Sequence, residues 1–155
     1  MRKIDIDARD RAILRALQDD GRLSNVELAE QVNLSPSACH RRVRMLEESG
    51  LIAGTVTLLN QEACGKPGTA FVEIMLDRQD RKALDAFEAV VATMPEVMEC
   101  YLVAGQSDYV IRTIYGDTAD FEHLHTDILT QLPGVVRVET TFVLRTVKRT
   151  TKMPI

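Results

Sequence analysis

Residues 24–50 are SNVELAEQVNLSPSACHRRVRMLEESG, and this stretch contains start and stop signals for two short helices. Ser24 followed three residues later by Glu27 is a capping box, in which each side chain accepts a free backbone N–H at the helix start. Apolar residues at helical spacing follow, so the sequence predicts a short helix that ends near Val32.

The second helix of this stretch is expected to follow after a tight turn. Asn33 tolerates a left-handed turn conformation, Ser35 is a typical N-cap, and Pro36 fits the first helical position, where no donor is needed. The helix is expected to run to about Ser49, because Gly50 then ends it.

The flanking residues extend this pattern in both directions. Asp7 is a plausible N-cap for an earlier helix that stops at residues 19–21 (DDG), and residues 51–59 (LIAGTVTLL) are β-prone. The order helix, helix, tight turn, helix, strand is that of a winged helix-turn-helix, a DNA-binding fold. We therefore expect a DNA-binding domain over residues 1–54 and a hinge strand and linker over residues 55–68.

The helix that begins at Pro36 has two chemically different faces. At about 100° per residue, Val43 and Leu46 lie within about 40° of Cys39, which makes this face apolar. The opposite face, between about 100° and 200°, contains four polar residues: Ser37, His40, Arg41 and Arg44. Such side chains can donate to phosphates and purine edges, and arginine can bind guanine in a bidentate manner. A solvated amphipathic helix without a partner is the alternative.

The second half of the chain changes to a mixed pattern after the turn-rich residues 60–68. Its elements are expected at 69–76 (strand), 80–94 (helix), 97–104 and 109–115 (a hairpin), 121–132 (helix) and 135–148 (strand). This βαββαβ order is the ferredoxin-like split unit, so the chain is predicted to be α+β, with this second domain over residues 69–155. Because both helices cover one sheet face, apolar residues on the other face predict a dimer at least.

Composition limits the functional classes. The chain has 155 residues, of which 45% are hydrophobic and 27% charged, with a net charge of −4. The first 50 residues contain nine basic and nine acidic side chains, but residues 34–45 contain His40, Arg41, Arg42 and Arg44 and no acid, so a local basic patch survives there. No apolar run is long enough for a membrane helix and the N-terminus has no signal-peptide core, so a cytoplasmic protein without a membrane partner is expected.

Catalytic and metal-binding signatures are not found in the sequence. Cys39, Cys64 and Cys100 are widely spaced, which predicts neither a disulfide framework nor a zinc site. His123 and His125 would project about 200° apart on a helix, so they are not expected to share a metal. The sequence therefore predicts neither an enzyme nor a cofactor-binding protein.

Several stretches together resemble the Lrp/AsnC (leucine-responsive, feast/famine) transcription regulators. They are SPSACHRRVRMLE (35–47), GQSDY (105–109), LPGV (132–135) and FVLRTVK (142–148), and the resemblance covers essentially the whole chain. It implies a homodimer that assembles into tetramers or octamers, binds double-stranded operator DNA, and senses a small effector, usually an amino acid, between dimers. Because a dimer would place two recognition helices in successive major grooves, palindromic operator sites are expected. By the same resemblance, the DNA-facing positions are Ser35, Ser37, His40, Arg41 and Arg44.

The resemblance also implies an effector site in the second domain. Gly105, Asp108 and Tyr109 match the turn that lines the effector cleft, and Leu102, Thr118, Thr140 and Thr141 fall at neighbouring positions. Backbone donors of such a turn can hold a carboxylate, while Asp108 can accept a hydrogen bond from an ammonium group. An ordinary hairpin is the structural alternative, because Gly-x-x-Asp is common turn chemistry.

Two other functions stay open from sequence. Sirohaem decarboxylases share the two-domain layout and use the second domain as a tetrapyrrole pocket, in which histidines matter, and here only His123 and His125 are available. A purely structural or chaperoning oligomer would show no sequence-dependent DNA binding.

Overall fold

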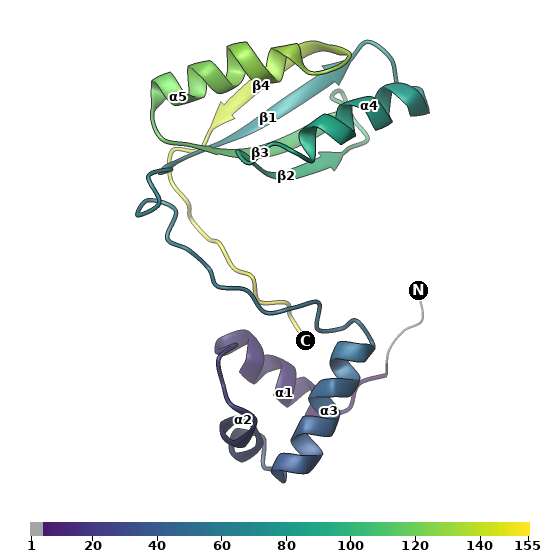
Figure 1. Cartoon of the computed structure of the whole chain (residues 1–155), viewed down its shortest axis with the longest axis vertical. Helices are drawn as coiled ribbons and strands as arrows, with labels where there is room; N and C mark the ends of the chain where they lie inside the picture. Colours follow the sequence, from purple (N-terminus) through teal and green to yellow (C-terminus); the bar gives the residue numbers. More distant parts are fainter. Residues whose placement is uncertain (1–4) are drawn as a thin grey trace. The chain divides into compact units, whose positions relative to one another are not determined.

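The chain forms two compact units (Figure 1). Each unit has its own hydrophobic core. The computed structural model describes residues 5–155. Unit 1 comprises the residues up to Leu58 together with Lys148–Ile155, and unit 2 is Leu59–Val147. The first four residues, which belong to the predicted domain 1–54 and to the N-terminus examined for a signal peptide, lie outside the described part.

Unit 1 begins with helices whose caps are those expected from the sequence. The helices are α1 (Ala8–Asp19), α2 (Asn25–Gln31) and α3 (Pro36–Glu48). At α1, Asp7 Oδ1 accepts from the Asp10 N–H at 2.8 Å, and Asp10 Oδ2 accepts from the Asp7 N–H at 3.1 Å. Ser24 and Glu27 form the predicted capping box at α2. These local hydrogen bonds fix where the two helices start.

The turn between α2 and α3 has the predicted chemistry. Asn33 has φ +54°, the Ser35 hydroxyl accepts from the Ala38 N–H at 3.3 Å, and Pro36 is the first helical residue. The Asn25 side-chain amide donates to the Pro36 carbonyl at 2.8 Å, which ties the start of α2 to the start of α3. The two helices of the motif are thus held by a hydrogen bond as well as by their shared core.

The core of unit 1 contains the apolar faces of all three helices. Ile13, Leu28, Ala29, Cys39 and Leu46 are all buried. Burial raises the pKa of the Cys39 thiol, which keeps it protonated and unreactive.

The strand predicted at residues 51–59 is not formed. The first strand of the described chain begins at Gly68, and Val56, Leu58 and Leu59 are at least 70% exposed in an extended segment. A strand needs a neighbour to satisfy its backbone groups, and this segment has no ladder partner among residues 5–155. The predicted hinge strand was wrong for this reason, since β-propensity alone does not supply the partner.

Unit 2 has the predicted βαββαβ order. Its elements are β1 (Gly68–Leu76), α4 (Arg81–Val91), β2 (Val97–Leu102), β3 (Tyr109–Tyr115), α5 (Thr118–His123), a π-helical turn (Leu124–Ile128), a 3-10 turn (Leu129–Gln131) and β4 (Val135–Phe142). The strands form one antiparallel sheet in the order β2-β3-β1-β4. The two helices cover one face of this sheet (Figure 1), where Val72, Ile74 and Ile111 are completely buried.

Strand β4 is shorter than the sequence predicted. It pairs with β1 up to Ala70 opposite Phe142, and the Val143 N–H makes one last bond to the Thr69 carbonyl. The neighbouring strand starts at Gly68, so the predicted extension to Lys148 has no partner, although its sequence is β-prone. Strand length is therefore decided by the neighbour.

The second face of the sheet has no helical cover in the described chain. Strand alternation places Phe71, Tyr101 and Thr141 on this face. Phe71 and Tyr101 are 39% and 55% exposed, and the Arg112–Glu99 ion pair (2.9 Å) lies beside them. The face is mixed rather than purely apolar.

None of the described helices is long and apolar enough to cross a membrane.

Candidate DNA interface and effector site

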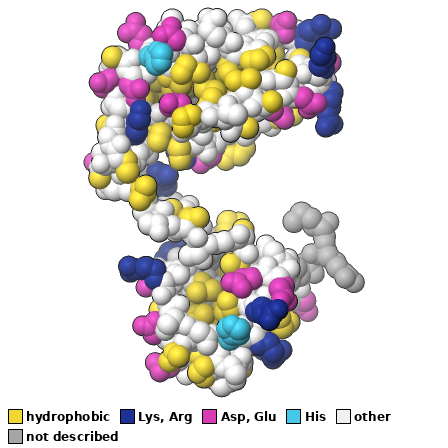
Figure 2. All heavy atoms as spheres, viewed as in Figure 1, with side chains coloured by type: hydrophobic (Ala, Val, Ile, Leu, Met, Phe, Trp, Pro, Cys, Tyr) yellow, Lys and Arg dark blue, Asp and Glu magenta, His cyan; other side chains and the backbone are white. Residues whose placement is uncertain are grey.

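The five residues predicted to contact DNA lie at one end and along one exposed side of α3. All of them are solvent-exposed: Ser35, Ser37, His40, Arg41 and Arg44. The buried residues of the same helix, Cys39 and Leu46, are on its other side. Figure 2 shows a histidine next to basic side chains on the surface of this unit. The structure therefore brings the polar face together as the angular estimate predicted.

Among residues 5–155, the two arginines of this face make only weak contacts. Arg44 Nε lies 2.7 Å from Glu48 Oε1, with 71% and 61% of the two side chains exposed. Arg41 Nη1 donates to the Met45 sulfur at 3.8 Å. Exposed i,i+4 ion pairs stabilise a helix by only about 0.3–0.5 kcal/mol. Both guanidinium groups can therefore exchange these contacts for phosphate or base contacts at low cost.

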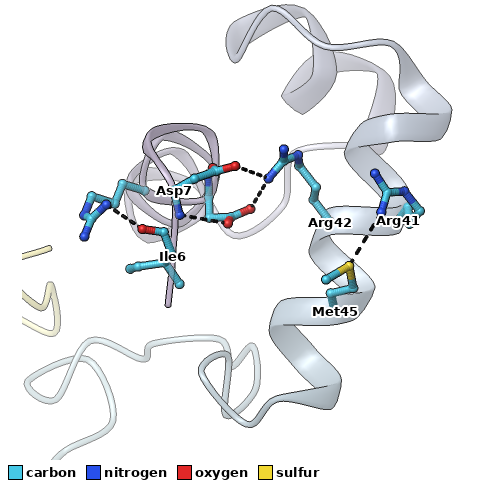
Figure 3. A network of polar contacts seen from close by, with 7 residues as sticks. Ile6, Asp7, Arg41, Arg42 and Met45 are labelled. Carbon is cyan, nitrogen blue, oxygen red and sulfur yellow. Dashed lines mark hydrogen bonds and ion pairs between the residues drawn. The ribbon is translucent and has the colours of Figure 1, made fainter. Parts of the chain in front are cut away.

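Arg42 has a different role, which the sequence analysis missed (Figure 3). Its Nη1 atom contacts Asp7 Oδ2 at 2.8 Å and Asp10 Oδ1 at 2.7 Å, so it joins α3 to the capping box of α1. The backbone N–H of Asp10 and the Arg42 guanidinium lower the pKa of Asp7, while the two carboxylates raise the pKa of Arg42. Arg42 lies about 60° from Cys39 on the helical projection, closer to the apolar face of α3 than to its polar face. This angle was the sequence signal that Arg42 differs from Arg41 and Arg44.

The ion pair of Arg42 with Asp7 and Asp10 fixes the position of α3 against α1. The Arg42 side chain is 26% exposed, so its charge sits between the two helices instead of facing outward. Arg41, its neighbour in sequence, contacts Met45 of its own helix instead of the α1 carboxylates (Figure 3). The two adjacent arginines therefore have different roles. Arg42 anchors α3 to α1, whereas Arg41 can contact a partner.

The predicted effector residue Asp108 is buried and already hydrogen-bonded. Its Oδ2 atom accepts from the Leu76 N–H and its Oδ1 atom from the Gln79 side-chain amide, both at 2.7 Å. Its own N–H donates to the Ile74 carbonyl at 2.9 Å. Asp108 therefore holds the end of β1 against the β2–β3 turn, which favours the hairpin alternative for this residue.

Tyr109 and Leu102 line a hollow of about 440 Å³ between α4 and β2. The Tyr109 hydroxyl donates to Glu88 Oε1 at 2.7 Å, and its ring centroid lies 4.4 Å from that of Phe87. Burial and the nearby Glu88 carboxylate raise the pKa of Tyr109. Glu88 and Met94, which also line the hollow, were missed by the sequence analysis, although both lie on the helical segment that it predicted.

The other predicted effector residues are spread over the unit and do not form one pocket with Tyr109. Gly105 is exposed in the β2–β3 turn, and Thr118 is the first residue of α5. Thr140 pairs with Val72 on the helix-covered face, whereas Thr141 pairs with Phe71 on the open face. The Thr140 Oγ1 atom is buried without a hydrogen-bond partner in the described chain.

The two histidines of unit 2 each contact another side chain of the same helical segment. His123 Nδ1 lies 2.7 Å from Asp127 Oδ2, and the His125 ring packs 6.1 Å from that of Phe121. Within residues 5–155, no group of three or more His, Cys, Asp or Glu side chains is arranged to hold a metal ion.

Comparison with known proteins identifies both units. A winged helix-turn-helix DNA-binding family model matches residues 6–53, and an Lrp/AsnC ligand binding domain model matches residues 69–153. The leucine-responsive regulatory protein of Salmonella typhimurium is 41% identical over 97% of the chain and 92% of its own length. That of Rhizobium meliloti is 42% identical over 94% of each.

Solved structures agree with these matches over the whole chain. A transcriptional regulator from Neisseria meningitidis, solved as a complex with L-Met, has a TM-score of 0.92 and 37% identity over 97% of each chain. The AsnC structure from E. coli has a TM-score of 0.88 and 26% identity, covering 97% of this chain and 100% of its own.

Proposed function

The chain belongs to the Lrp/AsnC family of transcription regulators, and from this we infer that it is a DNA-binding regulator that responds to an amino acid. The exposed polar side of α3 carries this inference, because capped, core-anchored α3 presents serine, histidine and arginine to solvent together. Such a helix fits the major groove, where its N-terminal residues contact base edges.

For DNA contact we propose five residues: Ser35, Ser37, His40, Arg41 and Arg44. Ser35 and Ser37 lie at the N-terminal end of α3, where a hydroxyl can donate to a phosphate. Arg41 and Arg44 follow on the exposed side, with only weak contacts of their own to give up. In this arrangement the serines position the helix and the arginines contribute to sequence preference.

For the effector we propose an amino acid bound at unit 2. The Neisseria meningitidis relative was solved with L-Met and the curated relatives are named as leucine-responsive, so these two amino acids are the first to test. The proposed effector positions are Leu102, Gly105, Asp108, Tyr109, Thr118, Thr140 and Thr141. Because they are scattered in one chain, we propose that a complete site needs more than one subunit, with Asp108 acting by holding the turn.

We propose that the protein assembles from dimers and binds palindromic sites. The open sheet face, with Phe71 and Tyr101 exposed, supports such an assembly. So does the extended segment that exposes Val56, Leu58 and Leu59 without a ladder partner among the described residues. Two α3 helices in one dimer would then occupy half-sites about one helical turn apart, or a small multiple of it.

We also propose that the chain is not an enzyme and that it acts in the cytoplasm. The relatives named above are regulators, and a basic α3 face has no role in a tetrapyrrole enzyme. Adding haem or sirohaem to the purified protein is expected to produce no shifted Soret band. A shifted band that is lost in the His123→Ala variant would favour the decarboxylase alternative instead.

Fluorescence anisotropy tests the proposed function directly. The purified protein is titrated onto its own upstream DNA and onto an unrelated duplex, over a series of salt concentrations, with and without amino acids. A preference for one duplex that an amino acid shifts is the expected result. Equal binding to both duplexes, weakening steeply with salt, would mean only counterion-driven association and would contradict the proposal.

A further inference from the structure

Helix α1 holds a segment from the far end of the sequence. We name residues Lys148–Ile155 the tail strap; they cluster with unit 1, although the sequence predicted them as part of the second domain. The Met153 N–H donates to Gln18 Oε1, and Gln18 Nε2 donates to the Met153 carbonyl at 3.2 Å. One side-chain amide thus satisfies both backbone groups of a single residue, as a neighbouring strand would.

Two charged residues of α1 extend this contact on either side. Arg15 donates from Nε and Nη2 to the Ile155 carbonyl at 2.9 and 2.7 Å, and Asp19 forms an ion pair with Lys152. Residues 15, 18 and 19 have i, i+3, i+4 spacing and therefore share one side of the helix. Their partners come in reverse order, so the strap runs antiparallel to α1.

One residue of the strap, Ile155, packs against the core, whereas the other contacts of the strap are exposed to solvent. The Ile155 side chain is half-buried and packs against the core of unit 1. Met153 is 70% exposed, and the Lys152 and Asp19 side chains are 56% and 61% exposed. Exposed ion pairs and hydrogen bonds of this kind are individually weak. The strap is therefore suited to being released and rebound, unlike a segment buried in the core.

The strap is continuous with the edge strand of unit 2. Strand β4 ends at Phe142, and only residues 143–147 separate it from the strap. On the other side, α1 is joined to α3 through Asp10 and Arg42. The covalent segment 143–147, the strap contacts on α1 and the Asp10–Arg42 ion pair thus connect β4, which carries Thr140 and Thr141, to the helix with the exposed arginines.

We propose that the tail strap couples unit 2 to the DNA-contacting helix, so that effector binding changes how tightly the strap holds α1. This inference rests on the proposed function. Coupling requires that the effector bind the strap-held and strap-released states with different affinity. A change in the extension of residues 143–147 on effector binding would produce that difference in affinity. A resulting shift of α1 would also move α3, because Arg42 joins the two helices. The linker after α3 is a separate connection, which the strap supplements.

The test compares the response to effector when the strap is loosened. The Gln18→Ala variant removes both bonds to Met153, and a variant truncated after Val147 removes the strap. Arg22→Ala is the control, because Arg22 is an exposed side chain just after α1 whose partner in the described chain is Asp20 and not the strap. Circular dichroism confirms that each variant is folded. The DNA probe is a duplex selected from a random pool by the wild-type protein, and each common amino acid is added in turn.

We expect one amino acid to change wild-type affinity by about 5-fold or more, as is typical of allosteric coupling. Gln18→Ala and the truncation should bind the duplex as tightly as the wild type without effector but lose most of that change, while Arg22→Ala keeps it. An unaltered response in both strap variants would overturn the coupling. Weakened binding before any effector is added would also overturn it, because the strap would then only support α1. A wild-type protein that selects no duplex would refute the proposed function itself.

Discussion

Replacing Arg44 with alanine should weaken DNA binding by an amount that can be estimated from its surroundings. A base contact contributes about 1–3 kcal/mol, which corresponds to roughly 5- to 150-fold in affinity. Arg44 must first leave Glu48, and an exposed i,i+4 pair of this kind costs about 0.3–0.5 kcal/mol to break. The net loss expected on substitution is therefore about 0.5–2.5 kcal/mol, with the unbound protein almost unaffected.

The reverse prediction concerns the partner of Arg44. Glu48→Gln removes the competing carboxylate and a negative charge from the exposed polar side of α3. Affinity should rise by about 2-fold, the equivalent of the released ion pair. In the Arg44→Ala background, Glu48→Gln should have a smaller effect, because no ion pair remains to be released. A double-mutant cycle measures this coupling directly.

Anisotropy titrations over a salt series distinguish the kinds of contact. If Arg44 binds a phosphate, the slope of log affinity against log salt should become shallower by about 0.9 in Arg44→Ala. If it binds a base, the slope stays and the preference between duplexes falls. Arg22→Ala is the control, since Arg22 is 92% exposed, pairs with Asp20 and is not part of α3. The reasoning is refuted if Arg44→Ala binds like the wild type, or if Arg22→Ala is equally impaired.

Three further predictions concern unit 2 and the thiols. Asp108→Ala leaves two donors without their acceptor and should lower the free energy of unfolding by about 1–3 kcal/mol, measured by chemical denaturation; unchanged stability would contradict the structural role. The Lys66 ammonium and the Gly116 N–H lower the pKa of Asp120 from 3.8, so their stabilisation is complete above that value and is lost as pH falls through the lower folded-state pKa. Lys66→Met should raise the Asp120 pKa in an NMR titration, and an unmoved pKa would disprove the pairing. In the native protein, exposed Cys64 should react rapidly with a maleimide and buried Cys39 only on unfolding; early labelling of Cys39 by mass spectrometry would be inconsistent with this core.

Features with local signals were predictable from the sequence. The caps at Asp7, Ser24 and Ser35 and the left-handed Asn33 each depend on residues a few positions apart, and all four are confirmed. The polar side of α3 follows from helical geometry alone in the same way. Where the hydrogen-bond partners of a residue lie a few positions away, the sequence pattern is enough to predict the local structure.

Features that depend on a distant partner were not predictable. The strand expected at 51–59 and the long β4 both failed because extended backbone needs a neighbour, which propensity does not reveal. The Arg42 anchor requires the packing of α1 on α3. The division of Thr140 and Thr141 between two faces could have been seen, because successive strand residues alternate.

The return of residues 148–155 to unit 1 also bears on the order in which the protein folds during synthesis. The three helices emerge from the ribosome early and can pack, since their core residues lie close together in sequence. The groups on Arg15, Gln18 and Asp19 that hold the strap must wait until all of unit 2 has been made. In a nascent chain, unit 1 would therefore lack its strap until synthesis ends. Unit 1 can be completed only after all of unit 2 has been translated.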